Sequence, residues 1–186
     1  RDRYLVLKED DCAQYISVFH NHGREAGATI WHPHSQIIAI PVVPPDVARS
    51  IRGSAIYFGN NRRCVYCTIL RQEIKDARRI VYKNRQFVAF CPFASRQAFE
   101  VRIFPLRHQP EFEATSGSAI PALADALRMV LAKLARGLNR PAYNFFIHTA
   151  PVSGIGLARY YHWHIEIIPK TATWAGFEIG TGIEIS

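Results

Sequence analysis

The sequence contains no apolar run near the ~20 residues that a helix needs to cross a bilayer. Its opening segment, Arg1–Lys8, also lacks the charged and then apolar layout of a secretory signal peptide. No low-complexity tract is present, and no run of arginines alternates with aromatic residues as in a nucleic-acid-binding track. These absences argue against membrane, secreted and nucleic-acid-binding proteins, and we expect a cytoplasmic protein.

Cysteine is scarce, with four residues in the chain, and one pair is closely spaced as Cys64-x-x-Cys67. In a reducing compartment this spacing favours a metal site or a redox pair over a disulfide framework. Against a redox pair, no helix N-terminus obviously follows the motif to acidify the first thiol. A Cys₂His₂ metal site would need two histidines brought in by the fold, and His108 and His162 are the candidates. The spacing is not that of a zinc finger, so a redox pair or plain packing remain alternatives.

The composition is that of a protein with a packed core. Of the 186 residues, 48% are hydrophobic and 12% aromatic, and the length suits one domain or one and a half small ones. The net charge of +8 comes mostly from arginine, whose planar fork suits phosphate and carboxylate groups. This charge fits an anionic substrate, but it fits an ordinary solvated basic surface as well.

Hydrophobic periodicity predicts an α+β domain in which helices pack on a mostly antiparallel sheet. We expect strands over residues 4–7, 15–19, 28–40, 80–82, 87–91, 99–104, 144–148 and 160–168. We expect helices over residues 46–58, 70–77 and 121–138, and the last is clearest because its apolar residues recur on one face. Prolines 41, 44 and 45 end the second long strand and suggest a boundary that divides the chain into residues 1–48 and 49–186.

A His-x-His motif occurs twice, each time with a polar residue two positions on: His32, His34 and Gln36, then His162, His164 and Glu166. Residues two apart on a strand face the same side, so each row is expected to project together. A polar row that faces a core requires a metal, a phosphate or a hydrogen-bonded network, whereas the alternative is a stripe that faces solvent. The repetition suggests a duplicated domain whose first copy is only partly present, and the start at Arg1 suggests an N-terminal truncation.

The segment Phe19–Ala39, which contains the His-Pro-His, resembles the active-site segment of galactose-1-phosphate uridylyltransferases, in the histidine-triad superfamily. The segments Tyr160–Lys170 and Ala175–Glu178 are similar to the C-terminal repeat of that family, and the elements between them follow the matching order. The resemblance implies a histidine-triad-like antiparallel sheet with packed helices. Residues 1–48 would end a first repeat, and residues 49–186 would form a complete second repeat.

The resemblance also implies roles for individual residues. His34 would be the nucleophile, and His32 would bind a first zinc ion, whose cysteine ligands in the family lie upstream of His34 and are not in this sequence. Phosphoryl oxygens would be bound by Asn21, Thr29 and Gln36, and sugar hydroxyls by Glu178. A structural zinc ion would be held by Cys64, Cys67, His108 and His162, with His164 in the place that mirrors the nucleophile.

The implied activity is transfer of UMP between UDP-glucose and galactose-1-phosphate through a covalent uridylyl-histidine, in a homodimer. The partners would be a nucleotide sugar and a sugar 1-phosphate. One alternative is an ADP-sugar phosphorylase or adenylyltransferase of the same family. Another is a non-catalytic zinc-binding module, and a basic nucleic-acid-binding zinc protein lacks the required alternation of aromatic and basic residues.

Overall fold

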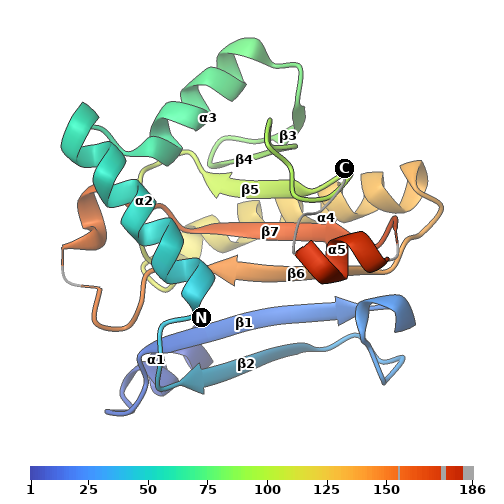
Figure 1. Cartoon of the computed structure of the whole chain (residues 1–186), viewed down its shortest axis with the longest axis horizontal. Helices are drawn as coiled ribbons and strands as arrows, with labels where there is room; N and C mark the ends of the chain where they lie inside the picture. The colour runs from blue at the N-terminus through green and yellow to red at the C-terminus, as the bar shows by residue number, and fades with distance from the viewer. Residues whose placement is uncertain (155, 173–174, 182–186) are drawn as a thin grey trace.

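The computed structural model of the chain contains one seven-stranded antiparallel sheet with the strand order β2-β1-β6-β7-β5-β4-β3 (Figure 1). It describes residues 1–154, 156–172 and 175–181, without the side chains of residues 158 and 178. The strands are β1 (Tyr15–His22), β2 (Ser35–Ile40), β3 (Ile80–Lys83), β4 (Phe87–Phe90), β5 (Val101–Pro105), β6 (Tyr143–His148) and β7 (His164–Pro169). The helices are α1 (Asp2–Lys8), α2 (Pro45–Asn61), α3 (Val65–Asp76), α4 (Ile120–Gly137) and α5 (Gly176–Thr181), with 3₁₀ turns η1 (Arg24–Ala26), η2 (Gly117–Ala119) and η3 (Leu157–Arg159). The predicted α+β class is confirmed.

The prediction of a strand at residues 4–7 was wrong, because this segment lies inside α1. A strand would have placed Tyr4 and Val6 on one face. In the helix, Tyr4 is 1% exposed and Leu7 packs beside it against the core, whereas Val6 is 61% exposed. The spacing of three between the two buried residues is that of a helix, and four apolar letters were too few to reveal it.

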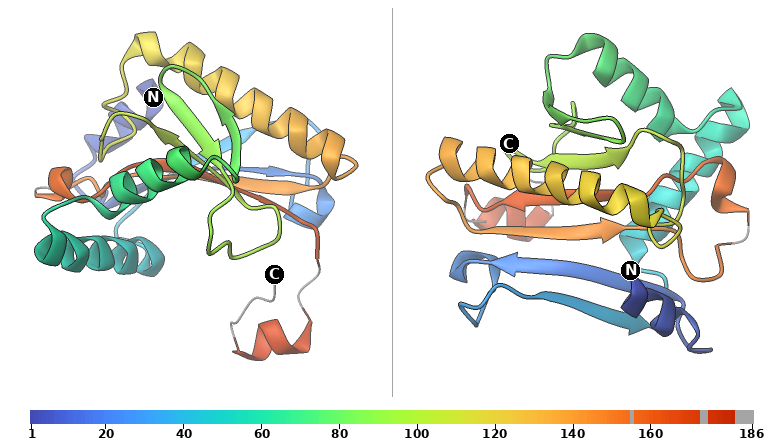
Figure 2. Two further views of the ribbon diagram at one scale, coloured as in Figure 1. Left: turned by 90° about the horizontal axis from the view of Figure 1, so that it is seen from above. Right: turned by 180° about the vertical axis from the view of Figure 1, so that it is seen from behind.

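One face of the sheet is covered by α4, which lies across it in both views of Figure 2. The buried side of α4 carries Leu123, Ala126, Val130 and Leu134, as its periodicity predicted. These residues belong to the main hydrophobic cluster, together with inward-facing residues of β5 and β7 such as Ile103. Each large aliphatic side chain buried in this way contributes roughly 1.5–3 kcal/mol relative to its exposed state.

The opposite face is covered near β4 and β5 by α3, which lies with α2 on the side of the sheet away from α4 (Figure 2). Tyr66 and Leu70 of α3 join a second hydrophobic cluster with Phe90 and Phe104. This packing holds the N-terminus of α3, where the Cys-x-x-Cys motif lies, against the sheet.

The sheet is continuous across the predicted boundary near residue 48, because β1 pairs with β6. In that register Phe19 lies opposite Phe146, and Asn21 lies opposite Asn144. The division into residues 1–48 and 49–186 therefore remains an interpretation based on the repeated motif. Among the described residues, no helix combines the length and the apolar character that a bilayer span requires.

Candidate active site and metal centre

The first His-x-His lies in the loop that connects η1 to β2. We expected a strand over residues 28–40, but β2 begins only at Ser35, so His32 and His34 precede it and Gln36 alone lies on the strand. Pro33 explains part of this difference, since proline has no N–H to donate to a sheet ladder. The loop leaves His32 exposed and His34 half-buried.

The imidazole of His34 is held by its own loop. Its Nδ1 lies 2.8 Å from the backbone oxygen of His32. A carbonyl oxygen only accepts hydrogen bonds, so Nδ1 carries the proton and donates it. In the neutral ring this leaves Nε2 with a free lone pair, which is the form of imidazole that attacks an electrophile.

A pocket of about 530 Å³ opens beside this loop and is lined by Asn21, Thr29 and His32 among others. The turn that forms its wall depends on glycine. Gly23 has a φ of 83°, and a Cβ added there would lie 2.6 Å from the Cβ of Ala142. The structure thus brings three of the predicted site residues to one pocket at the end of β1. The side chain of Glu178, on α5, lies outside the described residues.

His20 is a neighbour of this loop that the sequence reasoning did not single out. Its Nδ1 lies 3.3 Å from the hydroxyl of Ser35, and its ring stacks on Phe145 with centroids 5.0 Å apart. Burial lowers the pKa of His20, and the imidazoles of His22 and His34 lower it further. The neutral form is thereby favoured, which keeps an additional positive charge away from the His34 ring.

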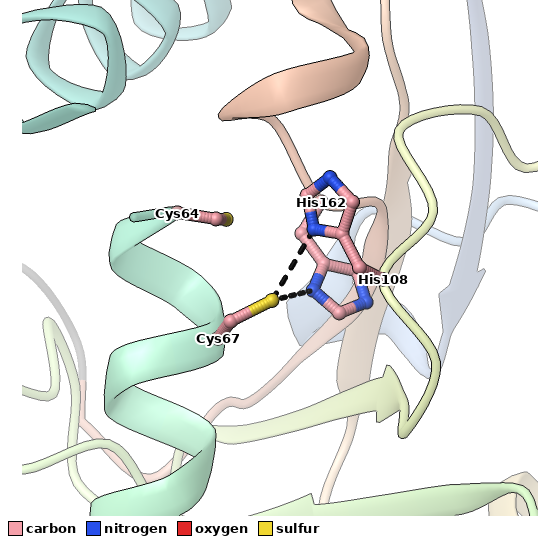
Figure 3. A group of neighbouring side chains, drawn as sticks. All are labelled: Cys64, Cys67, His108 and His162. Carbon is pink, nitrogen blue, oxygen red and sulfur yellow. Dashed lines mark hydrogen bonds between the residues drawn. The ribbon is translucent and has the colours of Figure 1, made fainter. Parts of the chain in front are cut away.

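The predicted metal-ligating residues come together at the N-terminus of α3 (Figure 3). The ligand atoms of Cys64, Cys67, His108 and His162 all lie within 4.8 Å of one another. The Sγ atom of Cys67 is 3.2 Å from Nδ1 of His108 and 3.7 Å from Nδ1 of His162. Zinc bonds of about 2.0–2.3 Å in a tetrahedron imply ligand separations of roughly 3.3–3.8 Å. The four side chains therefore fit a Cys₂His₂ zinc site, and zinc binding itself remains a proposal.

The expectation that no helix N-terminus lies at the cysteines was wrong, because the helix predicted over residues 70–77 already begins at Val65. Cys64 is the N-cap residue of α3, and Cys67 lies in its first turn. The hydrogen bond from Cys67 lowers the pKa of the Cys64 thiol far below its usual value, so the pair favours a thiolate. Helix position alone therefore no longer argues against redox chemistry. The two imidazoles beside Cys67 favour metal binding instead.

The second His-x-His has the same local hydrogen bond in a closed setting. Nδ1 of His164 lies 3.1 Å from the backbone oxygen of His162, as in the first motif. The ring of His164, however, is stacked between Phe104 and His148, with centroids 4.6 and 4.7 Å away. His164 is 4% exposed, and burial lowers its pKa well below the usual value.

Glu166 ends the second polar row and shares a face of β7 with His164, as predicted for a strand. Nε2 of His148 lies 2.8 Å from Oε2 of Glu166, and Arg102 approaches Oε1 at 3.8 Å. Arg102 also donates to buried Glu100 at 2.7 Å. The Glu166 carboxylate is thereby hydrogen-bonded through Oε2 and paired with Arg102, although its buried Oε1 accepts no hydrogen bond among the described residues. The cross-strand register of β5, β7 and β6 that builds this arrangement had no signal in the sequence.

Comparison with known proteins relates these features to characterised enzymes. The model of a family described as a domain of unknown function (DUF4921) matches residues 4–186. An ADP-glucose phosphorylase of Arabidopsis thaliana is 36% identical over 100% of this chain and 52% of its own. A galactose-1-phosphate uridylyltransferase of Thermotoga maritima is 31% identical over 97% of this chain and 58% of its own. A crystal structure of the A. thaliana ADP-glucose phosphorylase with bound ADP-glucose has a TM-score of 0.91, at 36% identity, over 99% of this chain and 58% of that one.

These similarities define a class of proteins related to enzymes of nucleotide sugars. The chain belongs to the DUF4921 family and, as its active-site segment predicted, to the galactose-1-phosphate uridylyltransferase family. It spans a little over half the length of the curated relatives it matches.

Proposed function

We propose that the protein transfers a nucleoside monophosphate from a nucleotide sugar through a covalent intermediate on His34. The observation that carries the proposal is the hydrogen bond from Nδ1 of His34 to the backbone oxygen of His32. It holds the ring in the tautomer whose Nε2 lone pair is available, so attack needs no separate base. The half-buried His34 directly follows the pocket-lining residues His32 and Pro33 in the chain, which supports access of a phosphoryl group to its ring.

In the first step the Nε2 lone pair of His34 forms a bond to the α-phosphorus. The bond from that phosphorus to the bridging oxygen breaks, and sugar 1-phosphate leaves with the bonding electrons. The incoming acceptor reverses these changes in the second step and restores neutral imidazole. Charge on the phosphoryl oxygens would be stabilised by donors from Asn21, Thr29 and Gln36, of which Asn21 and Thr29 line the pocket.

The Cys₂His₂ cluster is proposed to hold structural zinc. A closed set of four protein ligands leaves no position for substrate, so the ion would supply a rigid anchor and no chemistry at phosphorus. The residues would tie the N-terminus of α3 to the chain segments of His108 and His162. His32 belongs to no cluster of three or more ligating side chains within residues 1–154, 156–172 and 175–181, and its role as a zinc ligand remains a prediction.

Two substrate pairs are consistent with this chemistry. One is UDP-glucose with galactose-1-phosphate as the acceptor, as the resemblance of the active-site segment implies. The other is ADP-glucose with inorganic phosphate as the acceptor, and the 36% identity to an ADP-glucose phosphorylase against 31% to a uridylyltransferase favours it. Both use the same first step. A homodimer and a cytoplasmic location remain predictions.

The test is a rapid-mixing assay of the protein as its gene encodes it. Incubation with UDP-glucose or ADP-glucose should release glucose-1-phosphate in a burst before any acceptor is added, with an acid-labile adduct on the protein. The nucleotide that gives the faster burst identifies the base. His34→Asn should abolish both burst and adduct while the zinc content stays unchanged. An adduct that persists in His34→Asn would place the nucleophile elsewhere.

A further inference from the structure

The residue that lies opposite Asn21 across the β1–β6 pair is Asn144. Its Nδ2 group lies 2.8 Å from Oδ1 of Asn21 and also 2.8 Å from the backbone oxygen of Ala26. Asn144 is 123 positions away from Asn21 in the sequence, and it is half-buried on β6. One side chain of the proposed second repeat thus contacts Asn21, which lines the pocket, and the turn η1, whose neighbouring residues line it.

These two contacts determine how both amides are oriented. The oxygen of Ala26 is a backbone carbonyl, which only accepts, so the Asn144 atom beside it must be the NH₂ group. The same NH₂ group faces Asn21, so the Asn21 atom beside it must be the carbonyl oxygen. The orientation of two side-chain amides, which distances alone seldom settle, follows here from one fixed acceptor.

The consequence concerns what Asn21 presents to a ligand. With its oxygen engaged by Asn144, Asn21 keeps its Nδ2 group as a donor for the pocket that it lines. Phosphoryl oxygens are acceptors, so a donor stabilises them and a reversed amide would repel them. We propose that Asn144 is a positioning residue that fixes Asn21 as a hydrogen-bond donor toward the transferred phosphoryl group; this inference rests on the proposed function of the site.

The second contact of Asn144 extends the same effect to the loop. Ala26 lies in η1, between Gly23 and Gly27, which both have a positive φ. Holding the Ala26 oxygen limits the movement of this turn relative to β6. Asn144 thereby holds both the η1 turn and the Asn21 amide in place relative to β6. The site at the first His-x-His thus depends on a side chain from the second repeat.

Two variants of similar size to asparagine separate amide orientation from charge. In Asn144→Asp the carboxylate cannot donate, so Asn21 should reverse and turn its oxygen to the pocket. In Asn144→Leu neither orientation is fixed and no charge is added. We expect the rate constant of glucose-1-phosphate release to fall on the order of 100-fold in Asn144→Asp, as for the loss of one preorganised donor, and by less in Asn144→Leu. Zinc content and the thermal midpoint establish that each variant is folded.

A double-mutant cycle tests whether Asn144 acts through Asn21. In an Asn21→Ala background, Asn144→Asp should cause a much smaller further loss, because the group it positions is gone and only its contact with the Ala26 oxygen is still affected. Equal losses in both backgrounds would overturn the proposal, and so would a wild-type rate in Asn144→Leu, which would leave only charge repulsion. If Asn21→Ala is silent while His34→Asn abolishes the adduct, the positioning role fails and the proposed function stands.

A binding measurement covers the case in which no adduct forms. AMP or UMP should shift the side-chain NH₂ resonance of Asn21 in the wild-type protein and bind more weakly to Asn144→Leu. A shift and an affinity that are the same in both proteins would contradict the proposal independently of catalysis.

Discussion

The two His-x-His motifs have the same backbone-held imidazole and opposite surroundings. In each, the second histidine lies with Nδ1 near the backbone oxygen two residues earlier, at 2.8 Å for His34 and 3.1 Å for His164. His34 is half-buried beside a pocket, whereas His164 is closed between two rings and 4% exposed. The shared hydrogen bond selects the tautomer, and access decides whether the free nitrogen can react.

The first histidines of the two motifs, His32 and His162, also differ in their exposure to solvent. His32 is exposed in its loop, and His162 is fully buried beside the cysteines. Nδ1 of His162 faces Cys67, whereas its Nε2 is buried without a hydrogen-bond partner among the described residues. A metal-bound imidazole usually donates a hydrogen bond through its other nitrogen, so this Nε2 departs from the common pattern of zinc sites. The second motif thus lies in the closed interior and the first in an accessible loop, which fits the proposed division into a structural and a reactive motif.

The largest expected effect is a loss of stability when the proposed zinc site beside the second motif is disrupted. Cys67→Ser removes one of four zinc ligands, so we expect the metal content to fall from about one ion per chain to near zero. Because structural zinc contributes folding free energy, the thermal midpoint should fall by at least about 10 °C, measured by calorimetry with metal analysis.

The matched control for this variant is Cys12→Ser, since Cys12 is exposed and lies outside the cluster. It should leave both metal content and midpoint at their wild-type values. A Cys67→Ser protein that keeps its zinc, or loses it without destabilisation, would show that the cluster is no structural metal site.

A smaller effect is expected when the corresponding histidines of the two motifs, His34 and His164, are each replaced by alanine. His164→Ala should lower the free energy of unfolding by about 2–4 kcal/mol, because it leaves a cavity between Phe104 and His148. His34→Ala should change it by less than about 0.5 kcal/mol, as expected for a ring on an open loop. Urea denaturation measures both values, and equal losses would break the distinction between the two motifs.

Features that depend on a local sequence pattern were predictable from the sequence. The helical spacing of Leu123 to Leu134 predicted α4, and the residue types of Cys64 and His162 suggested a common site. Long-range register was not predictable. The contact between Asn21 and Asn144 exists because β1 pairs with β6 in one register, and neither strand encodes its partner locally.

Two errors have local causes. The strand predicted before Ser35 ignored the inability of Pro33 to join a ladder. The helix after the cysteines was predicted to start at residue 70 and not at Val65, because its N-cap is Cys64, which carries none of the usual Ser, Thr, Asp or Asn signals. The first error predicted a strand where the chain forms a loop, and the second predicted a turn where the helix has already begun.

The smallest expected effect concerns the third residue of the second motif. Burial raises the pKa of Glu166, but the hydrogen bond from His148 and the charge of Arg102 outweigh it, so the pKa is lowered from 4.5. A lowered acid pKa stabilises the fold above pH 4.5, and this contribution is lost as the pH falls through the folded-state pKa. Glu166→Gln should cost about 1–3 kcal/mol at pH 7.

The difference between wild type and Glu166→Gln should shrink as the pH falls below 4.5, measured by urea denaturation at several pH values. A constant difference across that range would mean that Glu166 stabilises the fold by packing and not by its charge.

The most direct test of the contrast between the two motifs is to locate the covalent nucleotidyl group. The protein as its gene encodes it is mixed with UDP-glucose or ADP-glucose without acceptor, quenched at alkaline pH, digested, and mapped by peptide mass spectrometry. We predict a nucleotidyl group on the peptide that contains His34 and none on the peptide that contains His164. A nucleotidyl group on His164, or the same occupancy on both peptides, would contradict the division into a reactive first motif and a structural second one.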